Sequence, residues 1–441
     1  MDKIVQGFEE LAADAYRRFA PMAGRYYYTF RRPLVTCGGV PCMIFLGNHS
    51  SGKSSLINWV LGGAPVQDVG LAPTDDGFTV ILHGETEEDV CGPAALSRLP
   101  KEFQDLESFG GTFLQHLKVK IRNRDILKTV TLIDSPGMID SAEGTVGRTY
   151  DFAGVVKLLA ELCDMVFFLL DPDKPGTTGE TVNVFAKCLA GTEFKLRVLL
   201  NKCDAFSSLY DFARTYGTTC WNLARVLHTK DLPQIWTIYT GEERASANGA
   251  FDLSDFNRHR AEFLGVLHDA AARRKDNVFS QALADFQGLS VRMCVVNHAA
   301  RRLSAFQTAC YVFGGLSVAA IALAVWHILT SRFGWGNAGA GTIAVLLAGL
   351  GFFLTYGIIR VAVRLARLSL ARKVDEIFAH EYRQQVVLGT HDNISQYWES
   401  TREETAETIR NAPLKLPLFG EFNRKRLEAA TAKLRAAFHT A

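Results

Sequence analysis

One short segment constrains this chain more than any other, because its glycines, lysine and serine follow the pattern GxxxxGK[ST]. The segment is Gly47-Asn48-His49-Ser50-Ser51-Gly52-Lys53-Ser54. An apolar run at 42–46 precedes it, and a helix-forming stretch that begins with Ser55 follows it. A strand, a loop and a helix in this order let backbone N–H groups close around phosphates beside the positive end of the helix dipole. We therefore predict a phosphate-binding loop, in which Lys53 reaches the outer phosphates and Ser54 binds Mg²⁺.

Two further motifs follow apolar strands downstream of this loop. They are Asp134-Ser135-Pro136-Gly137 and Asn201-Lys202-Cys203-Asp204. In a GTPase-type site, the DxxG motif brings its carboxylate near Mg²⁺ and its glycine N–H to the γ-phosphate, while the NKxD motif binds guanine through its Asp. Because each motif ends an apolar run, we expect all three at the carboxyl edge of one sheet. The residues predict a nucleotide site with Mg²⁺, and Asp204 favours GTP.

A switch loop between the first two motifs is expected to supply a threonine to Mg²⁺. The segment Ala72-Pro73-Thr74-Asp75 has the right place in the chain. We predict Thr74 as a metal ligand beside Ser54 and Asp134, and as a catalytic residue with Lys53.

Hydrolysis needs a group that orients the attacking water. The residue after Gly137 is Met138, which cannot do so. His49 is the first candidate, because a side chain inside the phosphate-binding loop can point at the γ-phosphate. The alternative is that His49 only fills the loop surface.

The fold class follows from short apolar runs that alternate with helical patterns. The runs lie at 41–46, 78–82, 129–133, 164–170, 196–200 and 234–239. Such alternation predicts an α/β fold with a mostly parallel sheet and helices on both faces, which is the architecture of a P-loop NTPase. Residues 250–308 are expected to be helical.

Charge and cysteine content exclude some classes of protein. The formal net charge is +2, with Lys+Arg 48 against Asp+Glu 46, which gives no case for nucleic acid as a partner. The nine cysteines contain no CxxC pair, so we expect small buried side chains in a reducing compartment rather than a disulfide framework. The acidic N-terminus, with Asp2 and Glu9, has no apolar core of a secretory signal.

Two uncharged stretches, 309–329 and 339–359, have the length of a bilayer core. The short connection between them predicts a hairpin with both ends on one side of the membrane. Arg301 and Arg302 precede it, and Arg360, Arg364 and Arg367 follow it. Positive flanks of this kind place the nucleotide domain on the cytosolic side, with the arginines near anionic headgroups. The open alternatives are two core helices of a soluble bundle and a shallow hairpin within one leaflet.

At these residues the chain resembles the dynamin superfamily, and within it the EH-domain-containing (EHD) ATPases and sarcalumenin. The segments that carry the resemblance are 69–80, 133–138, 148–152, 200–204 and 216–223. It implies a dynamin-type G domain, whose dimerisation assembles the catalytic machinery. It also keeps ATP open as the substrate, since EHD proteins have an NKxD-like motif and use ATP.

The chain departs from the EHD pattern in three ways. No EH domain is visible, and the two apolar stretches stand where EHD proteins have the membrane-contacting tip of their helical domain. In addition, Asp75 stands where the family has a second Thr. An acid there could still bind the metal but adds charge repulsion beside the γ-phosphate, so fast and slow hydrolysis both stay open.

These observations predict an N-terminal helical lead, a dynamin-type G domain, a helical domain in two parts, and a transmembrane hairpin between the parts. The helical lead is expected at 1–38 and the G domain at 39–248. The helical domain is expected at 249–308 and 364–441, with the hairpin between its two parts at 309–363. The last stretch, 421–438, is expected to pack on the helical domain rather than on lipid. The predicted function is a membrane-anchored GTPase that couples G-domain dimerisation to membrane remodelling or tethering. The alternatives are ATP as substrate and a nucleotide-binding scaffold with little hydrolysis.

Overall fold

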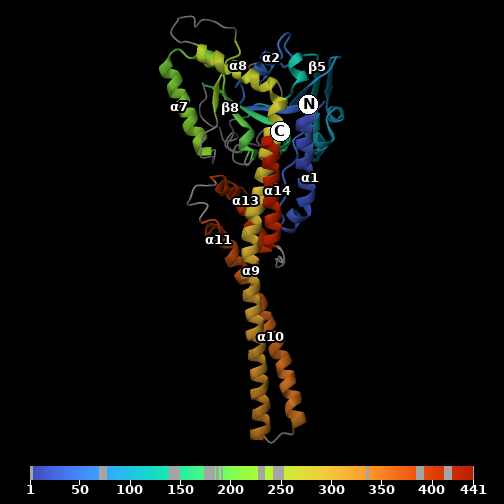
Figure 1. Ribbon diagram of the computed structural model, residues 1–441, viewed down its shortest axis with the longest axis vertical. Coiled ribbons are helices and arrows are strands. Elements are labelled where there is room, and N and C mark those ends of the chain that lie inside the picture. The colour runs from blue at the N-terminus through green and yellow to red at the C-terminus, as the bar shows by residue number, and fades with distance from the viewer. Residues whose placement is uncertain are drawn as a thin grey trace. The chain divides into compact units, whose positions relative to one another are not determined.

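The structure is a computed structural model, and its elements are labelled in Figure 1. It describes residues 3–68, 77–138, 149–172, 184, 188–189, 192–226, 234–241, 253–333, 337–383, 392–411 and 420–440. The chain divides into two compact units. The first comprises Met1–Tyr16, Phe30–Leu283 and Leu434–Ala441, and the second Arg17–Thr29 and Ala284–Lys433.

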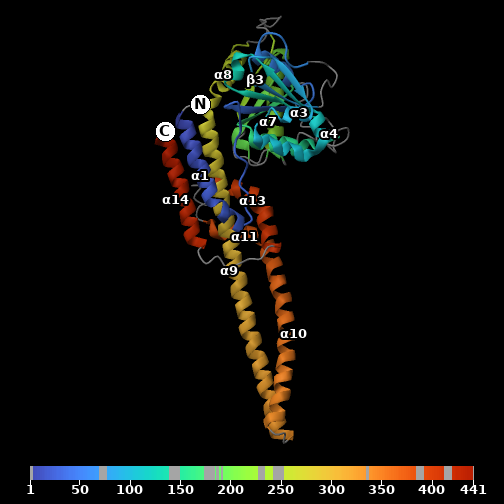
Figure 2. The same cartoon turned by 90° about the vertical axis from the view of Figure 1, so that its right-hand side faces the viewer.

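A twisted sheet is the centre of the first unit (Figure 2). Its described strands are β1 (Thr36–Cys37), β2 (Val40–Gly47), β3 (Phe78–His83), β4 (Glu88–Cys91), β5 (Leu117–Arg122), β6 (Thr131–Asp134), β7 (Met165–Leu170), β8 (Leu196–Leu200) and β9 (Ile235–Thr237). They lie in the order β4-β5-β3-β6-β2-β7-β8-β9, and β1 pairs with β2. The block from β6 to β9 is parallel, whereas β3 runs antiparallel to β6. The predicted mostly parallel sheet is confirmed.

Each face of the sheet has its own core, because side chains alternate along the strands. On β2, Ile44 and Leu46 belong to one core, while Met43 and Phe45 belong to the other. The first core is covered by α3 (Pro93–Leu96), η1 (Lys101–Phe109), α4 (Gly110–Gln115), α5 (Phe152–Leu162) and α7 (Leu209–Val226). The second is covered by α2 (Lys53–Leu61), η2 (Asp125–Lys128) and α8 (Ser254–His268). Helices therefore cover both faces, as predicted.

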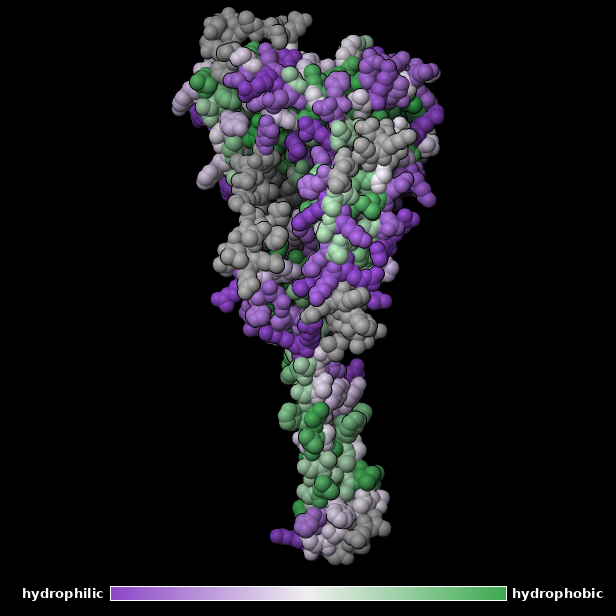
Figure 3. Space-filling view, viewed as in Figure 1, coloured by the Kyte–Doolittle hydropathy of each residue, from purple (hydrophilic) through white to green (hydrophobic). Residues whose placement is uncertain are grey.

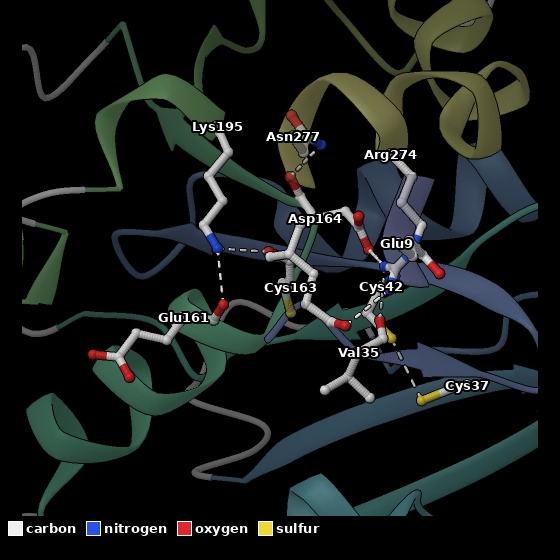
Figure 4. A network of polar contacts seen from close by, with 11 residues as sticks. Glu9, Val35, Cys37, Cys42, Glu161, Cys163, Asp164, Lys195, Arg274 and Asn277 are labelled. Atoms are coloured by element: carbon white, nitrogen blue, oxygen red, sulfur yellow. Dashed lines mark hydrogen bonds and ion pairs between the residues drawn. The ribbon is translucent and has the colours of Figure 1, made fainter. Parts of the chain in front are cut away.

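The amino edge of β7 holds a buried polar network (Figure 4). Asp164, which precedes β7, accepts a 2.7 Å bond from Nη1 of Arg274. Arg274 belongs to α9 (Ala270–Phe333) and also donates to the Leu34 carbonyl at 2.8 Å. Its Nε contacts Glu9 of α1 (Lys3–Arg25) at 2.5 Å. One guanidinium thus fastens two helices to the sheet, at the edge away from the predicted nucleotide motifs.

The second unit is helical. Besides the later part of α9, its helices are α10 (Asn337–Arg372), α11 (Val374–Glu381), α13 (Asp392–Asn411) and most of α14 (Gly420–Thr440). Arg292 of α9 is almost fully buried and donates to Glu404 and Thr408 of α13 at 2.8 and 2.7 Å. Leu427 of α14 is fully buried, so α14 packs on protein as predicted.

Parts of α9 and α10 run alongside each other and expose mainly apolar side chains, which Figure 3 shows in green. Phe313, Leu346 and Phe353 are 70%, 69% and 75% exposed. Both helices have the length and composition to cross a membrane, and their most apolar windows are 0% and 11% buried. In the single chain these windows are therefore not the core of a soluble bundle.

All nine cysteines lie among the described residues and are free thiols. Five are buried, as predicted: Cys37, Cys42, Cys163, Cys188 and Cys203. The expectation is wrong for Cys91, which is exposed on the edge strand β4, and for Cys220, Cys294 and Cys310, which are partly exposed. Edge strands and helix surfaces bury only one side of a residue, which composition alone does not reveal.

Candidate nucleotide-binding site

The GxxxxGK[ST] segment forms a loop between β2 and α2, as the sequence predicts. Ser50 and Gly52 have φ angles of 64° and 88°, so the loop winds through left-handed backbone before α2 begins at Lys53. The Lys53 ammonium is bent back over this loop. Its Nζ donates to the carbonyls of Gly47 and Asn48 at 2.9 and 3.1 Å. Lys53, which is predicted to reach the outer phosphates, thus has its ammonium group against the backbone of the phosphate-binding loop.

The DxxG motif is joined to this loop by backbone hydrogen bonds. The N–H of Met138 donates to the Gly47 carbonyl at 3.1 Å, and the N–H of His49 donates to the Met138 carbonyl at 3.0 Å. At Gly137 the two segments touch, since a Cβ there would lie 2.7 Å from the His49 Cα. Only glycine permits this approach. The predicted γ-phosphate contact of Gly137 therefore lies beside the loop that carries Lys53.

The predicted metal ligands Ser54 and Asp134 are in contact. Ser54 Oγ donates to Asp134 Oδ2 at 2.8 Å, and Asp134 is only 5% exposed. Gln67 donates to the same carboxylate oxygen through Nε2 at 2.7 Å. Hydroxyl and carboxylate oxygens side by side are the hard donors that Mg²⁺ takes in proteins.

The NKxD motif packs directly beneath the phosphate-binding loop. Asn201 is 1% exposed, and its Nδ2 donates to the Ser51 carbonyl at 2.9 Å. A Cβ on Gly52 would lie 2.4 Å from that Nδ2. The Asn of this motif therefore supports the loop, a role that the motif pattern does not state.

The two charged residues of the motif lie at the surface end of β8. Lys202 has a φ of 58°, and its Nζ pairs with the buried Asp171 at 2.7 Å. Asp204 is exposed, and its Oδ2 would lie 3.5 Å from a Cβ on Gly241, in the segment after β9. The exposed Asp204 carboxylate, between the segments that follow β8 and β9, is therefore accessible to the base of a nucleotide.

The structure brings most of the predicted site residues to one edge of the sheet. They are Gly47, Asn48, His49, Ser50, Ser51, Gly52, Lys53, Ser54, Ser55, Asp134, Gly137, Asn201, Lys202 and Asp204, at the ends of β2, β6 and β8 and the start of α2. Thr74 and Asp75 lie outside the described residues. The described contacts of His49 involve its backbone, so its catalytic role stays a prediction.

Sequence reasoning missed Gln67, Asp171 and Gly241. Asp171 had a usable signal, because it directly follows the apolar run of β7 at the same edge. Gln67 and Gly241 follow no motif, and only the fold brings them to Asp134 and Asp204.

Comparison with known proteins agrees with this architecture. No family model matches the chain. It is 28% identical over 312 residues to EH domain-containing protein 2 of Arabidopsis thaliana, a match that covers 68% of this chain and 56% of the relative. It is 35% identical over 204 residues to EH domain-containing protein 2 of Rattus norvegicus, covering 46% and 37%. The chain spans about half the length of the curated relatives it matches.

Among solved structures, a chain of an oligomerised bacterial dynamin pair aligns over 92% of this chain, with a TM-score of 0.37 and 12% identity. The Era protein of Aquifex aeolicus aligns over 51%, with a TM-score of 0.29. The sequence matches show that this chain is related to the EH domain-containing proteins, and its sheet has the P-loop architecture that the sequence predicts.

Proposed function

We propose that this protein is a membrane-anchored, dynamin-like nucleoside triphosphatase that couples nucleotide binding to G-domain association and membrane remodelling or tethering. The observation that carries the proposal is the meeting of three motifs at one sheet edge. Asp134 contacts Ser54, Gly137 abuts the loop backbone, and Asn201 bonds the loop from below. Groups gathered in this way from three strands match the phosphate, metal and base parts of one nucleotide.

The residues fit a magnesium ion. Ser54 and Asp134 would hold it, with Thr74 as the further ligand, and the ion would neutralise charge on the outer phosphates. The chain's own residues supply the rest. Backbone N–H groups of the loop and Lys53 bind the phosphates, while the N–H of Gly137 is placed to sense the γ-phosphate. The segments at 66–78 and 137–152 are the proposed switches.

GTP is the favoured substrate, and ATP is the alternative. Asp204 supports GTP, because an exposed carboxylate can accept from both the ring N–H and the exocyclic amine of guanine. Adenine offers no such pair of donors. The resemblance of the motifs to those of the EHD ATPases supports ATP.

We propose that α9 and α10 form the membrane anchor, with the G domain on the cytosolic side. The exposed apolar windows support this, as do the basic side chains beyond each window. The helix α9 also contains Arg274, which is bonded to the sheet at Asp164. A helix that begins at the G domain and ends in lipid offers a route by which nucleotide-driven movement strains the bilayer.

A second copy of the chain is the proposed partner. On α7, Tyr210 and Trp221 are 74% and 69% exposed. They lie about three helical turns apart, so they share one face. Large exposed aromatic side chains on one face are typical of protein interfaces.

Nucleotide turnover on liposomes tests the enzyme claim. Wild type and Lys53→Ala are compared with Mg·GTP and with Mg·ATP, at several protein concentrations. We expect turnover that rises with protein concentration in wild type and is lost in Lys53→Ala. Equal turnover in both proteins would contradict the proposal.

The second candidate is a nucleotide-dependent scaffold that hydrolyses slowly. It is favoured by Met138, which is 2% exposed in the core rather than directed at water near the phosphates. Turnover that stays slow at high protein concentration and with lipid, despite tight binding, selects this candidate.

A further inference from the structure

Side chains of the kinds that bind metals are clustered in the second unit, whereas the nucleotide motifs belong to the first. His298, His380 and Glu381 offer ligand atoms that all lie within 4.8 Å of one another. Cys294 Sγ lies 3.5 Å from Glu381 Oε2 but outside the group of ligand atoms that are all within 4.8 Å of one another, so it joins them as a fourth donor only when its side chain or a histidine ring rotates. The cluster unites α9 with α11, two helices far apart in the sequence.

The spacing of the four residues suits chelation. Cys294 and His298 are separated by one helical turn on α9 and therefore project from the same face. His380 and Glu381 are neighbours at the end of α11, and both approach His298. The Glu381 carboxylate bonds His298 Nδ1 at 2.6 Å, and His380 Nδ1 lies 3.9 Å from the same oxygen. The cysteine spacing in the sequence does not reveal this site, because half of the ligands come from another helix.

We propose that Cys294, His298, His380 and Glu381 bind one divalent transition-metal ion of the zinc type. Two imidazoles, a thiolate and a carboxylate form the mixed donor set that zinc takes with tetrahedral geometry. Bonds of tetrahedral zinc place ligand atoms about 3.3 to 3.8 Å apart. The 3.5 Å distance falls at that spacing, the 3.9 Å distance has to shorten, and the 2.6 Å contact has to lengthen as the ion replaces the shared proton.

Charge around the cluster is balanced for a divalent cation. A thiolate and a carboxylate neutralise the two charges of the ion. Burial and Glu381 raise the pKa of the Cys294 thiol to about 11, and the guanidinium of Arg424, 3.9 Å from Sγ, opposes that rise, so the bound ion itself has to displace the thiol proton. Glu428 pairs with Arg424 at 3.5 Å and offsets its charge.

The helix that supplies half of the ligands is held from its other side. Phe378 of α11 stacks on Trp398 of α13 with ring centroids 4.8 Å apart. Trp398 Nε1 also donates to Asp375 Oδ1 at 3.0 Å. Such supporting contacts orient metal ligands before the ion arrives. The ion would therefore tie α11 to α9 and stiffen the helices that lead into and out of the apolar pair.

Zinc retention and affinity test the site. Full-length protein in detergent, without any polyhistidine tag, is stripped with a chelator and titrated with Zn²⁺ against a chromophoric competitor. We expect one Zn²⁺ per chain and a higher thermal midpoint with zinc. His380→Ala should weaken binding by about a hundredfold or more, because it removes an exposed ligand that the fold does not need. Loss of an exposed histidine elsewhere, in His268→Ala, should leave the affinity unchanged.

Cobalt supplies a readout that is independent of folding. Co²⁺ should give a thiolate charge-transfer band that Cys294→Ser removes while the ligand-field bands persist. Lys53→Ala should bind both ions as wild type does, so this test does not depend on the nucleotide site. Failure to bind zinc, or equal binding by wild type, His380→Ala and Cys294→Ser, would overturn the assignment.

Discussion

Arg274 Nη1 lies 2.7 Å from Asp164 Oδ2, with side-chain exposures of 5% and 1%. The pair joins the start of α9 to the amino edge of β7. Burying two charges costs free energy that their attraction has to offset, so the loss of one partner is more harmful than the loss of an exposed pair.

Arg274→Met is therefore expected to lower the free energy of unfolding of the first unit by about 3 to 5 kcal/mol. Denaturant titration measures the change. The matched control is Arg258→Met, which removes an exposed pair to Asp255 and Glu262 and should cost at most about 0.5 kcal/mol. Similar losses in the two variants would show that the buried pair has no special role.

The same carboxyl gives a pH prediction. Burial raises the pKa of Asp164 to about 6, although Arg274 and Lys195 oppose the rise. An unfolded Asp titrates near about 3.9, so the folded state binds the proton more tightly. This group's contribution to stability is therefore complete below about pH 4 and is lost as the pH rises through about 6.

The measurement compares wild type with Asp164→Asn from pH 7 to 4. We expect wild type to gain stability relative to the variant as the pH falls, because only wild type takes up the proton. A relative stability that stays flat to pH 4 would mean that Arg274 outweighs burial and holds the carboxyl ionised.

Gly137 offers a steric test of the site. In Gly137→Ala the new Cβ would meet the His49 backbone at 2.7 Å, so the two loops must separate. We expect nucleotide affinity to fall by about tenfold or more, which corresponds to about 1.4 kcal/mol. Gly217→Ala on α7 is the control, since nothing lies within 4 Å of its Cβ. Binding of a fluorescent nucleotide distinguishes the variants, and unchanged affinity in Gly137→Ala would refute the close approach.

Base selectivity should depend on Asp204. Asp204→Asn replaces the carboxylate by an amide that cannot accept two guanine N–H donors. If GTP is the substrate, its affinity should drop by about tenfold or more while that of ATP changes little. Parallel titrations decide the matter, and a variant with unaltered preference would favour the ATP alternative.

The anchor is tested by charges in its apolar windows. Ile321 and Phe353 are 62% and 75% exposed, and each Lys there should cost about 2.5 to 3.5 kcal/mol of insertion free energy. Wild type should resist carbonate extraction from membranes, whereas Ile321→Lys/Phe353→Lys should be released. Leu209→Lys, an exposed change in the G domain, should stay in the pellet with wild type. Release of wild type by carbonate would argue for a peripheral association instead.

The sequence predicted the elements that single segments encode. The apolar runs before Gly47, Asp134 and Asn201 are strands, because continuous apolar residues belong to buried parallel strands. The strand β5 was not predicted, because charged and apolar residues alternate in its sequence, LKVKIR. It lies next to the edge strand β4 and so has no continuous apolar run. The long helices α9 and α10 extend well beyond the apolar windows that revealed them.

Contacts between distant segments could not be predicted in the same way. The NKxD motif does not predict the hydrogen bond from the Asn201 amide to the Ser51 carbonyl. The sequence around Gln67 likewise does not predict its hydrogen bond to Asp134. Such contacts depend on strand order, which brings β8 near β2 and leaves no trace in local pattern. The histidine and cysteine cluster could not be predicted because its side chains come from α9 and α11, two helices that meet only in the folded chain.

Calorimetric titration of the full-length chain with Mg·GTP and with Mg·ATP tests the central claim most directly. We predict saturable heat with at least one of the two nucleotides for wild type, and an affinity weaker by about a hundredfold or more for Lys53→Ala. Absence of heat with both nucleotides, or equal affinity in the two proteins, would contradict the account.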